Sequence, residues 1–394
     1  MTSQDVTNYD SEIKKLMNEN RTDVFFILYD GFLTNHMSHG IRALQMLGAP
    51  LPQVKNFVER YKNKLESGEF HKNKELKEDP EGLSPDELIG ARKSFYFLYD
   101  HYTKLLNDKY SKRLDDLVRG EFPRLSRGII AVHCLIHLGY GMDSGLAWFV
   151  CEGLAYLHYY YVPLSLSASC PDLQRFGHGN KDILAVLDQL REDGELITYM
   201  NEAAKQIKPD IGDFQKKTRV LCNNKGDVMV GYVNKVKFPC NLNQAEISLE
   251  DIPSILNWLI NSAIIVYAIA ETPNSFFLLH GVTSSWSLKN VLGCLDDIRI
   301  ILDAIRTHMC TLFVTYMVQG CPLLQRELIS NNPAKGHDWS DIRERAVDIE
   351  MNGDEHIYKL VQVCRRMTEE STDETMTDVY KLAAYLCISN PLHF

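Results

Sequence analysis

Two pairs of histidines are spaced like neighbouring residues on one face of a helix. His36 and His39 are three residues apart, and His133 and His137 are four apart within the apolar run 128–138. A helix would place both imidazoles of a pair on the same side, where two neutral imidazole nitrogens can bind one zinc or iron ion. Each pair taken alone also fits structural histidines that are hydrogen-bonded to backbone or carboxylate groups.

Two later segments carry a single histidine and a histidine–lysine pair. His280 follows large apolar side chains and precedes three hydroxyl-bearing residues, of which Ser284 could orient the imidazole as a neighbour of a metal ligand does. His356 and Lys359 flank the apolar stripe of a predicted helix. A lysine in that place usually extends its amine to water, and the alternative is a lysine that takes part in the chemistry.

The sequence lacks the common motifs of nucleotide binding and of several hydrolases. It contains no GxxxxGK[ST], GxGxxG, HExxH or GxSxG pattern. Gly139 and Gly141 follow a predicted helix instead of a strand, and Gly145 comes one residue late for the dinucleotide spacing. A conventional flavin- or nicotinamide-binding domain is therefore disfavoured.

The composition is that of an ordinary soluble protein. The 52 acidic residues outnumber the 42 basic ones, for a formal charge of −10, so nucleic acid is not the expected partner. Hydrophobic residues make up 45% of the chain, which argues against disorder. Only 23 glycines and 14 prolines occur in 394 residues, which favours long helices over turn-rich sheets. We therefore expect an all-α, mainly helical fold.

Apolar residues recur mostly at three-to-four spacing, the period of a helix with one buried stripe. Segment 223–242 alternates apolar and polar residues and predicts a small β-hairpin near 225–240, whereas 71–82 and 330–338 have the composition of loops. Without a long linker or an internal repeat, we expect a polar N-terminal segment (1–24) and a single helical domain (25–394). The predicted helices are 9–18, 32–47, 51–67, 85–106, 110–120, 125–161, 182–193, 249–271, 275–317, 356–369 and 378–386.

Several features favour a cytoplasmic protein with no membrane partner. The N-terminus is polar and lacks the apolar core of a secretory signal, and the longest apolar run, 255–270, is interrupted by polar residues and too short for a membrane span. The ten cysteines form no CxxC pair. The cysteines in apolar stretches are expected to be reduced, buried thiols, namely Cys134, Cys151, Cys294, Cys310, Cys364 and Cys387.

Taken together, four blocks resemble the questin oxidase-like family. They are FLTNHMSH at 32–39 with LGAP at 47–50, HCLIHLGYG at 133–141, FFLLHGVTSS at 276–285, and DEHIYK at 354–359. Each block is weakly specific alone, but the four occur in the family's order, and the resemblance spans from about residue 25 to the C-terminus. Gly40 and Cys134 depart from the family pattern, where His and Pro are expected.

The resemblance implies a mainly helical oxygenase that oxidises polycyclic aromatic ketones such as anthraquinones with dioxygen, by Baeyer–Villiger-like oxygen insertion or ring cleavage. It implies non-haem Fe(II) bound by several histidines and by a lysine carboxylated by carbon dioxide. Neutral imidazoles and an anionic oxygen ligand form a mixed shell that suits Fe(II). The match places these roles on His36, His133, His137, His280 and Lys359, with His356 and His39 in reserve. Because one octahedron needs fewer histidines, one or two of them must have a supporting role.

Several parts of this hypothesis stay open at the level of sequence. The substrate pocket is predicted to include His39, Tyr140, Trp148, Tyr159, Tyr160 and Trp286, although aromatic residues of a stripe are more often core. Carboxylation needs a neutral amine, so Lys359 should have a lowered pKa, from burial or from nearby positive charge such as Arg365 or Arg366. The substrate, an NADPH requirement and the oligomeric state do not follow from the sequence.

Two other functions remain as alternatives. A helical metal-dependent hydrolase could use His337 and Asp338, but these lie in a Pro- and Gly-containing loop, and only Asp143 and Glu152 are obvious acids after the HxxxH pair. A non-catalytic helical binding protein would use its histidines structurally.

Overall fold

The computed structural model describes residues 3–77, 84–130, 132–168, 170, 173–207, 212–239, 247–348, 350 and 353–393. This part of the chain is mainly helical with a single two-stranded hairpin, which confirms the predicted all-α class. The helices are α1 (Ser3–Asn18), α2 (Met37–Met46), α3 (Leu51–Tyr61), α4 (Gly68–Lys77), α5 (Phe95–Asp108), α6 (Leu114–Glu121), α7 (Val132–Ser144), α8 (Ala147–Tyr159), α9 (Ile183–Glu192), α10 (Gly194–Lys205), α11 (Asp213–Asn224), α12 (Gly226–Val233), α13 (Ile252–Ile269), α14 (Phe276–Leu292), α15 (Ile298–Val318), α16 (Glu327–Ser330), α17 (Trp339–Val347), α18 (Glu355–Glu370) and α19 (Glu374–Ser389). Short 3₁₀ segments cover Lys62–Lys64, Pro85–Leu88, Phe122–Arg124, Ser126–Gly128, Leu173–Arg175 and Leu249–Asp251.

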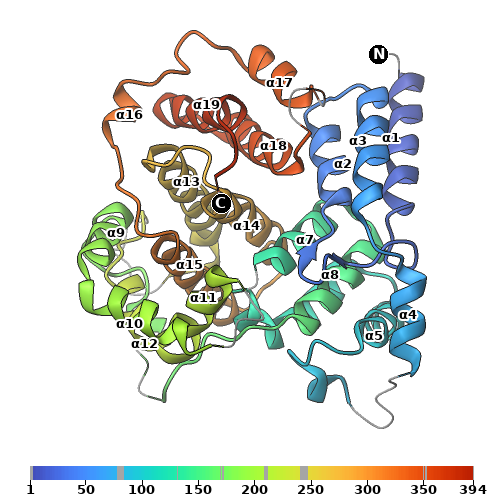
Figure 1. Ribbon diagram of the computed structural model, residues 1–394, viewed down its shortest axis with the longest axis horizontal. Helices are drawn as coiled ribbons and strands as arrows, with labels where there is room; N and C mark the ends of the chain where they lie inside the picture. The colour runs from blue at the N-terminus through green and yellow to red at the C-terminus, as the bar shows by residue number, and fades with distance from the viewer. Residues whose placement is uncertain are drawn as a thin grey trace.

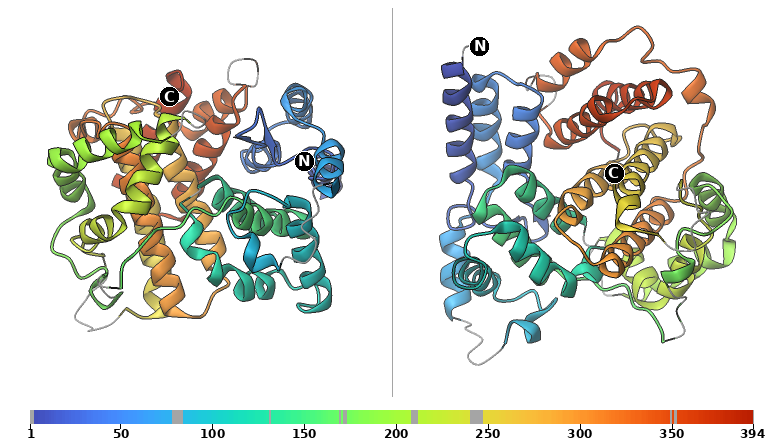
Figure 2. Two further views of the ribbon diagram at one scale, coloured as in Figure 1. Left: turned by 60° about the horizontal axis from the view of Figure 1, so that its bottom comes forward. Right: turned by 180° about the vertical axis from the view of Figure 1, so that it is seen from behind.

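Helix α14 lies at the centre of the helical packing. It contacts α7, α13, α15 and α18, and these helices surround it in Figure 1. The three N-terminal helices α1, α2 and α3 lie side by side along one side of the molecule (Figures 1 and 2). Ile13, Leu16 and Met17 of α1 are buried, so residues 3–18 of the predicted polar N-terminal segment pack onto the rest of the protein.

Small residues allow α7 to lie very close to its neighbours. A Cβ atom added at Gly139 of α7 would lie 2.3 Å from Ser287 Cβ on α14, and one added at Gly153 of α8 would lie 2.6 Å from Leu138 Cα. Real Cβ atoms do not approach other atoms this closely, because interiors are packed to the density of organic crystals. Gly139 therefore sets the separation of α7 and α14, the helices that carry His133 and His280, and Gly153 sets that of α7 and α8.

The predicted hairpin near 225–240 is wrong. Residues Gly226–Val233 form α12, and Met229, Val230 and Val233 are buried at the three-to-four spacing that also fits the apolar residues of this segment. The observed hairpin pairs Leu28–Tyr29 with Leu33–Thr34. Its three-residue loop, 30–32, has Asp30 at φ 48° and Gly31 at φ 76°, and the left-handed backbone at Gly31 is one that glycine adopts without a steric cost.

Four long predicted helices are interrupted. Segment 85–106 consists of a 3₁₀ turn at Pro85–Leu88 and α5, which begins only at Phe95. Segment 125–161 divides into α7 and α8 at Gly145, which has φ 65°. Segment 275–317 divides into α14 and α15. The Asp297 side chain caps the start of α15 by accepting hydrogen bonds from Arg299 N and Ile300 N. Segment 32–47 contains the second hairpin strand before α2 begins. The predicted loop 71–82 is helical as far as Lys77, and its remainder lies outside the described residues.

Two helical stretches, Leu249–Ile269 and Ile298–Val318, are long and apolar enough to cross a membrane by length and composition. Most of each apolar window (67% and 83%) is buried inside the molecule, as in the core helices of soluble proteins. The six cysteines that were predicted to be buried thiols are all free and buried.

The contact between α7 and α14 gives a first prediction. Gly139→Ala should lower the free energy of unfolding by about 1–3 kcal/mol, because the new methyl group would have to push Ser287 and its helix away. Chemical denaturation at equilibrium measures this change.

The matched control is Gly231→Ala in α12, where an added Cβ meets no atom within 4 Å. That variant should be about 0.5–1 kcal/mol more stable than the wild type, since alanine favours the helix. Equal destabilisation by both substitutions would contradict the close-packing account.

Candidate metal centre

Four imidazoles from four separate segments converge. His36 is the N-cap residue of α2, His133 and His356 lie in the first turns of α7 and α18, and His280 lies in α14. The ring centroids of His36 and His133 are 5.2 Å apart, those of His133 and His280 are 4.6 Å apart, and those of His280 and His356 are 4.9 Å apart. The centroids of His356 and His36 close the ring at 4.9 Å.

Hydrogen bonds fix the orientation of two of these rings. His280 Nδ1 donates to the carbonyl oxygen of Phe276 at 2.7 Å, and His356 Nδ1 donates to Asp354 Oδ1 at 2.7 Å. A neutral imidazole that donates through Nδ1 carries its lone pair on Nε2, so each ring has the tautomer of a metal-binding histidine. His280 Nε2 lies 3.0 Å from His133 Nε2, and His356 Nε2 is buried with no hydrogen-bond partner among the described residues.

His36 has the same division between its two nitrogens. Its Nδ1 atom lies 3.2 Å from Glu355 Oε1, whereas its Nε2 atom is buried and has no partner in the described part of the chain. The His36 backbone N–H donates to the Tyr61 hydroxyl, which in turn lies 3.4 Å from Glu355 Oε1. His36, Glu355 and His356 could hold a metal ion by the distances among their ligand atoms. Lys359 Nζ lies at the same distance, 3.2 Å, from His36 Nδ1. Because protein groups contact the Nδ1 atoms of His36 and His356, the two Nε2 atoms are the nitrogens left to bind a metal ion.

The environment of three of these imidazoles, those of His36, His133 and His280, favours the neutral form that metal ligands must have. Burial, followed by the charge of Lys359, lowers the pKa of His36 well below its usual range and the pKa of His133 to about 3. Burial and the neighbouring histidines lower the pKa of His280 in the same direction. Burial opposes ionisation of Asp354, but hydrogen bonds from His356 outweigh it and lower the pKa of this carboxyl to about 2.

Lys359 lies beside this cluster on α18 and is completely buried. Its Nζ atom is 3.2 Å from His36 Nδ1. Burial lowers the pKa of this amine to about 8, although the carboxylates of Glu355 and Asp354 act to raise it. A substantial fraction of the amine is therefore neutral, and so nucleophilic, near pH 8. The cause is burial, and not Arg365 or Arg366, which form ion pairs with Glu369 and Glu370.

His137 does not lie with the four converging rings. Its Nδ1 atom shares a hydrogen bond with His39 Nε2 at 3.1 Å, and its Nε2 atom lies 3.0 Å from Glu152 Oε1. Glu152 is itself buried and accepts a hydrogen bond from Thr22 N, while burial raises its pKa. His39, His137 and Glu152 thus form a second buried chain, adjacent to His36 because the rings of His36 and His39 are 5.1 Å apart.

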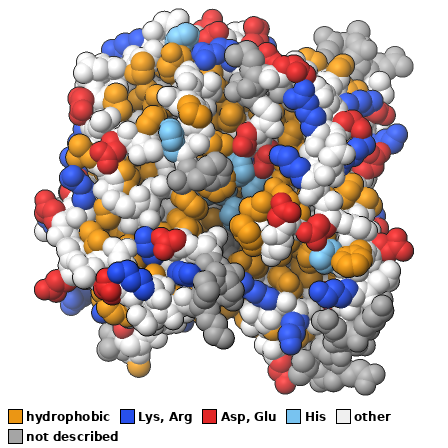
Figure 3. Space-filling view, in the orientation of Figure 1, with side chains coloured by type: hydrophobic (Ala, Val, Ile, Leu, Met, Phe, Trp, Pro, Cys, Tyr) orange, Lys and Arg blue, Asp and Glu red, His pale blue; other side chains and the backbone are white. Residues whose placement is uncertain are grey.

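A cavity of about 320 Å³ opens beside the four histidines, within the size range of small-molecule sites. It is lined by His36, His133, His280 and His356, and by aromatic side chains that include Tyr160 and Phe277. Figure 3 shows a hollow near the centre of this face, where histidine side chains meet hydrophobic ones.

Most aromatic residues predicted for the substrate pocket lie elsewhere. The exception is Tyr160, which lines the cavity. The Tyr140 hydroxyl donates to Gln362 and its ring packs on Trp286, while Trp148 Nε1 donates to Asn18 Oδ1. Tyr159 packs edge-on against Phe95. Tyr140 and Trp286 belong to the buried stripes of α7 and α14, whereas Trp148 and Tyr159 of α8 are partly buried.

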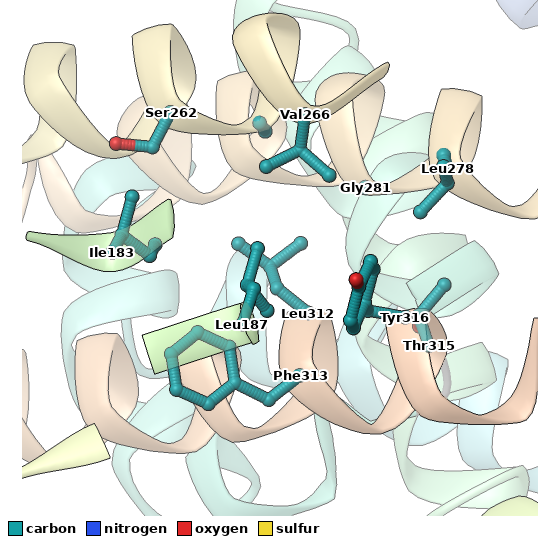
Figure 4. A pocket seen from close by; sticks show the side chains of 11 residues that line it. Ile183, Leu187, Ser262, Val266, Leu278, Gly281, Leu312, Phe313, Thr315 and Tyr316 are labelled. Atoms are coloured by element: carbon teal, nitrogen blue, oxygen red, sulfur yellow. The ribbon is translucent and has the colours of Figure 1, made fainter. Parts of the chain in front are cut away.

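A much smaller void, of about 30 Å³, lies between α9, α13, α14 and α15. Figure 4 shows apolar side chains such as Leu187, Leu312 and Phe313 around it. With room for about one water molecule and little polar lining, it is a packing gap.

Some groups of the site were not predicted from the sequence. Asp354, Glu355 and Phe276 lie in the four blocks that resemble the family, but the sequence predicts no role for them, and Tyr61 lies outside these blocks. The available signal was an Asp-Glu pair directly before a histidine at a helix start, where Asp354 both caps α18 and orients His356. His337, the residue suggested for a hydrolase, donates a hydrogen bond from Nδ1 to Asp341 Oδ2 at 2.7 Å, at the start of α17.

Comparison with known families agrees with the blocks around these residues. The model of the family described as questin oxidase-like matches residues 33–364, which is most of the chain. No curated protein matches the chain.

The lowered pKa of Lys359 predicts a pH dependence in metal-free protein. The unfolded chain binds a proton at Lys359 below about pH 10.4, but the folded protein does so only below about 8, so this residue lowers stability as the pH falls through that window. The wild type should therefore lose stability between pH 10 and pH 7, and Lys359→Met should not lose this contribution. The free energy of unfolding of Lys359→Met, minus that of the wild type, should be about 2–3 kcal/mol larger at pH 7 than at pH 10.

Urea denaturation of both proteins at pH 7 and pH 10 measures this difference. Comparing the two proteins cancels the titration of the buried tyrosines, which both contain. A difference that does not change with pH would show that Lys359 carries its charge at pH 7 without penalty.

Proposed function

The chain belongs to the questin oxidase-like family, and we propose that it is a non-haem iron-dependent oxygenase acting on a polycyclic aromatic ketone or quinone. The family indicates an oxidoreductase. The observation that carries the finer proposal is the convergence of four imidazoles whose Nε2 atoms are either unpartnered or directed at one another. Buried nitrogen lone pairs without hydrogen-bond donors are costly unless a cation binds them.

The residues present fit an iron ion. We assign nitrogen ligation to the four converging histidines, His36, His133, His280 and His356. His137, which the sequence placed among the ligands, is assigned a supporting role with His39 and Glu152, because its two nitrogens already contact these groups.

Lys359 is assigned the anionic oxygen ligand. Its neutral amine would attack carbon dioxide, forming a carbamate on Nζ and releasing one proton. Burial favours this step because it keeps part of the amine unprotonated at neutral to mildly alkaline pH. Four neutral imidazoles and one anionic oxygen donor form a shell suited to Fe(II).

The bound iron would supply the redox chemistry that a reaction with dioxygen requires. The protein's own contribution is orientation and exclusion of water. Phe277 stacks on Phe214 with ring centroids 3.9 Å apart, and both line the cavity. Together with Tyr160 and Phe276, they offer flat apolar surfaces to a fused-ring substrate beside the histidines.

Metal content tests the ligand set. Untagged protein loaded anaerobically with Fe(II) should hold about one iron per chain. Lys359→Ala and His356→Ala should lose most of the bound iron. Removing a residue that only supports a ligand weakens metal binding roughly 10- to 100-fold, and removing a ligand itself should weaken it further.

His308→Gln is the matched control, because His308 is equally buried but bonds Ser285 outside the cluster. Elemental mass spectrometry gives the iron content, and circular dichroism checks the fold. Full iron occupancy in Lys359→Ala would show that Lys359 is not an iron ligand.

Oxygen consumption tests the activity. The iron-loaded protein should consume dioxygen when a hydroxylated anthraquinone is added, and Lys359→Ala should not do so at any bicarbonate concentration. Parallel assays with and without NADPH decide whether a reductant is needed. Full activity in metal-free protein would contradict the proposal.

A further inference from the structure

Two arginines line the cavity beside the histidines, Arg92 before α5 and Arg219 on α11. The rest of the lining is largely apolar and aromatic. Among the described lining residues, Glu355 carries the only carboxylate, and it lies beside His36 and Tyr61. Neither arginine has a carboxylate partner for its guanidinium within the described part of the chain.

Arg92 is held in place by its backbone and by an aromatic ring. It has φ 52°, and its N–H donates to the carbonyl oxygen of Tyr159 at the end of α8. Its guanidinium carbon lies 3.9 Å from the centroid of the Tyr160 ring, which also lines the cavity. A guanidinium that lies on an aromatic ring keeps the N–H groups at its edge available for an anion.

Helix α11 supplies further donors. Arg219 lies one turn from Gln215 and beside Thr218, and all three line the cavity. The Thr218 hydroxyl is buried and has no hydrogen-bond partner among the described residues. Polar groups left unsatisfied at the wall of a cavity are matched by polar groups of what binds there.

The charge balance points to an anion. A half-buried guanidinium without a carboxylate is poorly compensated, and it pairs most strongly with a planar carboxylate or with another anionic oxygen. A neutral fused-ring molecule would bury the aromatic lining but leave both guanidinium groups unpaired.

We propose that Arg92 and Arg219 bind an anionic oxygen, a carboxylate or an ionised phenol, on a flat aromatic ligand whose rings lie against the aromatic wall. The pairing would determine which end of the ligand faces the histidines. The identification of this ligand with the substrate rests on the proposed function, whereas the binding itself requires no metal.

Binding of two matched probes to the full-length protein tests the proposal. Anthraquinone-2-carboxylate and its neutral carboxamide are nearly equal in shape, and calorimetry gives the dissociation constant of each. The wild type should bind the carboxylate more tightly. Arg92→Gln and Arg219→Gln should each weaken carboxylate binding by about 10- to 100-fold, but carboxamide binding by less than about threefold.

Two further variants separate charge from geometry. Arg92→Lys keeps the charge but loses the planar fork, so its affinity for the carboxylate should fall between those of the wild type and Arg92→Gln. Arg299→Gln removes an exposed arginine at the far end of α15 and should leave both dissociation constants unchanged. Equal binding of the two probes by the wild type would overturn the proposal, as would unchanged carboxylate binding in both cavity variants.

Two arms distinguish the anion and the dependence on iron. The first arm measures the binding of 2-hydroxyanthraquinone across the pH range in which its phenol ionises. Binding that strengthens with ionisation, while carboxylate binding stays constant, would identify a phenolate as a ligand. Weak binding at every pH would restrict the site to carboxylates. Metal-free wild-type protein should bind the carboxylate as tightly as the iron-loaded protein does. If binding persists but no iron-dependent oxygen consumption is found, the proposed function fails and the anion site stands.

Discussion

The site depends on the different contacts of the two nitrogens of its buried imidazoles: Nδ1 contacts a protein group, and Nε2 faces the cluster. Phe276 O and the Asp354 carboxylate accept from the Nδ1 atoms of His280 and His356, and Glu355 lies against Nδ1 of His36. The Nε2 atoms of His36 and His356 are thereby left without a hydrogen-bond partner among the described residues. Burial lowers the pKa of His36 and of His280, which favours their neutral form. Without these outer contacts, the same four histidines would be an unsatisfied polar cluster in the core.

The helices bring this chemistry together at their starts. His36, His133 and His356 stand at or next to the N-termini of α2, α7 and α18, where the helix dipole disfavours an imidazolium and favours anionic groups such as Asp354 and Glu355. The central helix α14 contributes His280, and Gly139 allows α7 to approach it closely enough for the His133 and His280 Nε2 atoms to lie 3.0 Å apart. The close packing at Gly139 therefore also determines the geometry of the histidine cluster.

The sequence predicted the helical class and the segments of the site better than the role of each residue. The i, i+4 spacing indicated that His133 and His137 lie on the same helix, as they do on α7. It did not indicate their different partners: His133 contacts His280, whereas His137 contacts His39 and Glu152. His356, predicted only as a reserve, lies with the converging four because α18 packs against both α2 and α14. Tyr160 lines the cavity as predicted, but Tyr140, Trp148, Tyr159 and Trp286 do not. A stripe that contains Tyr140 and Trp286 is the same pattern whether it faces a ligand or another helix. Helix ends at Gly145 and Asp297, and the tight turn at Asp30 and Gly31, depend on single residues that periodicity does not register.

The central claim is that one iron ion binds between four imidazoles and a carboxylated Lys359. Anomalous scattering at the iron edge, from crystals of iron-loaded protein grown with bicarbonate, tests it most directly. The account predicts one iron peak within bonding distance of the Nε2 atoms of His36, His133, His280 and His356, and additional density for a carbamate on Lys359 Nζ. A peak between His39, His137 and Glu152, or no peak among the four histidines, would contradict it.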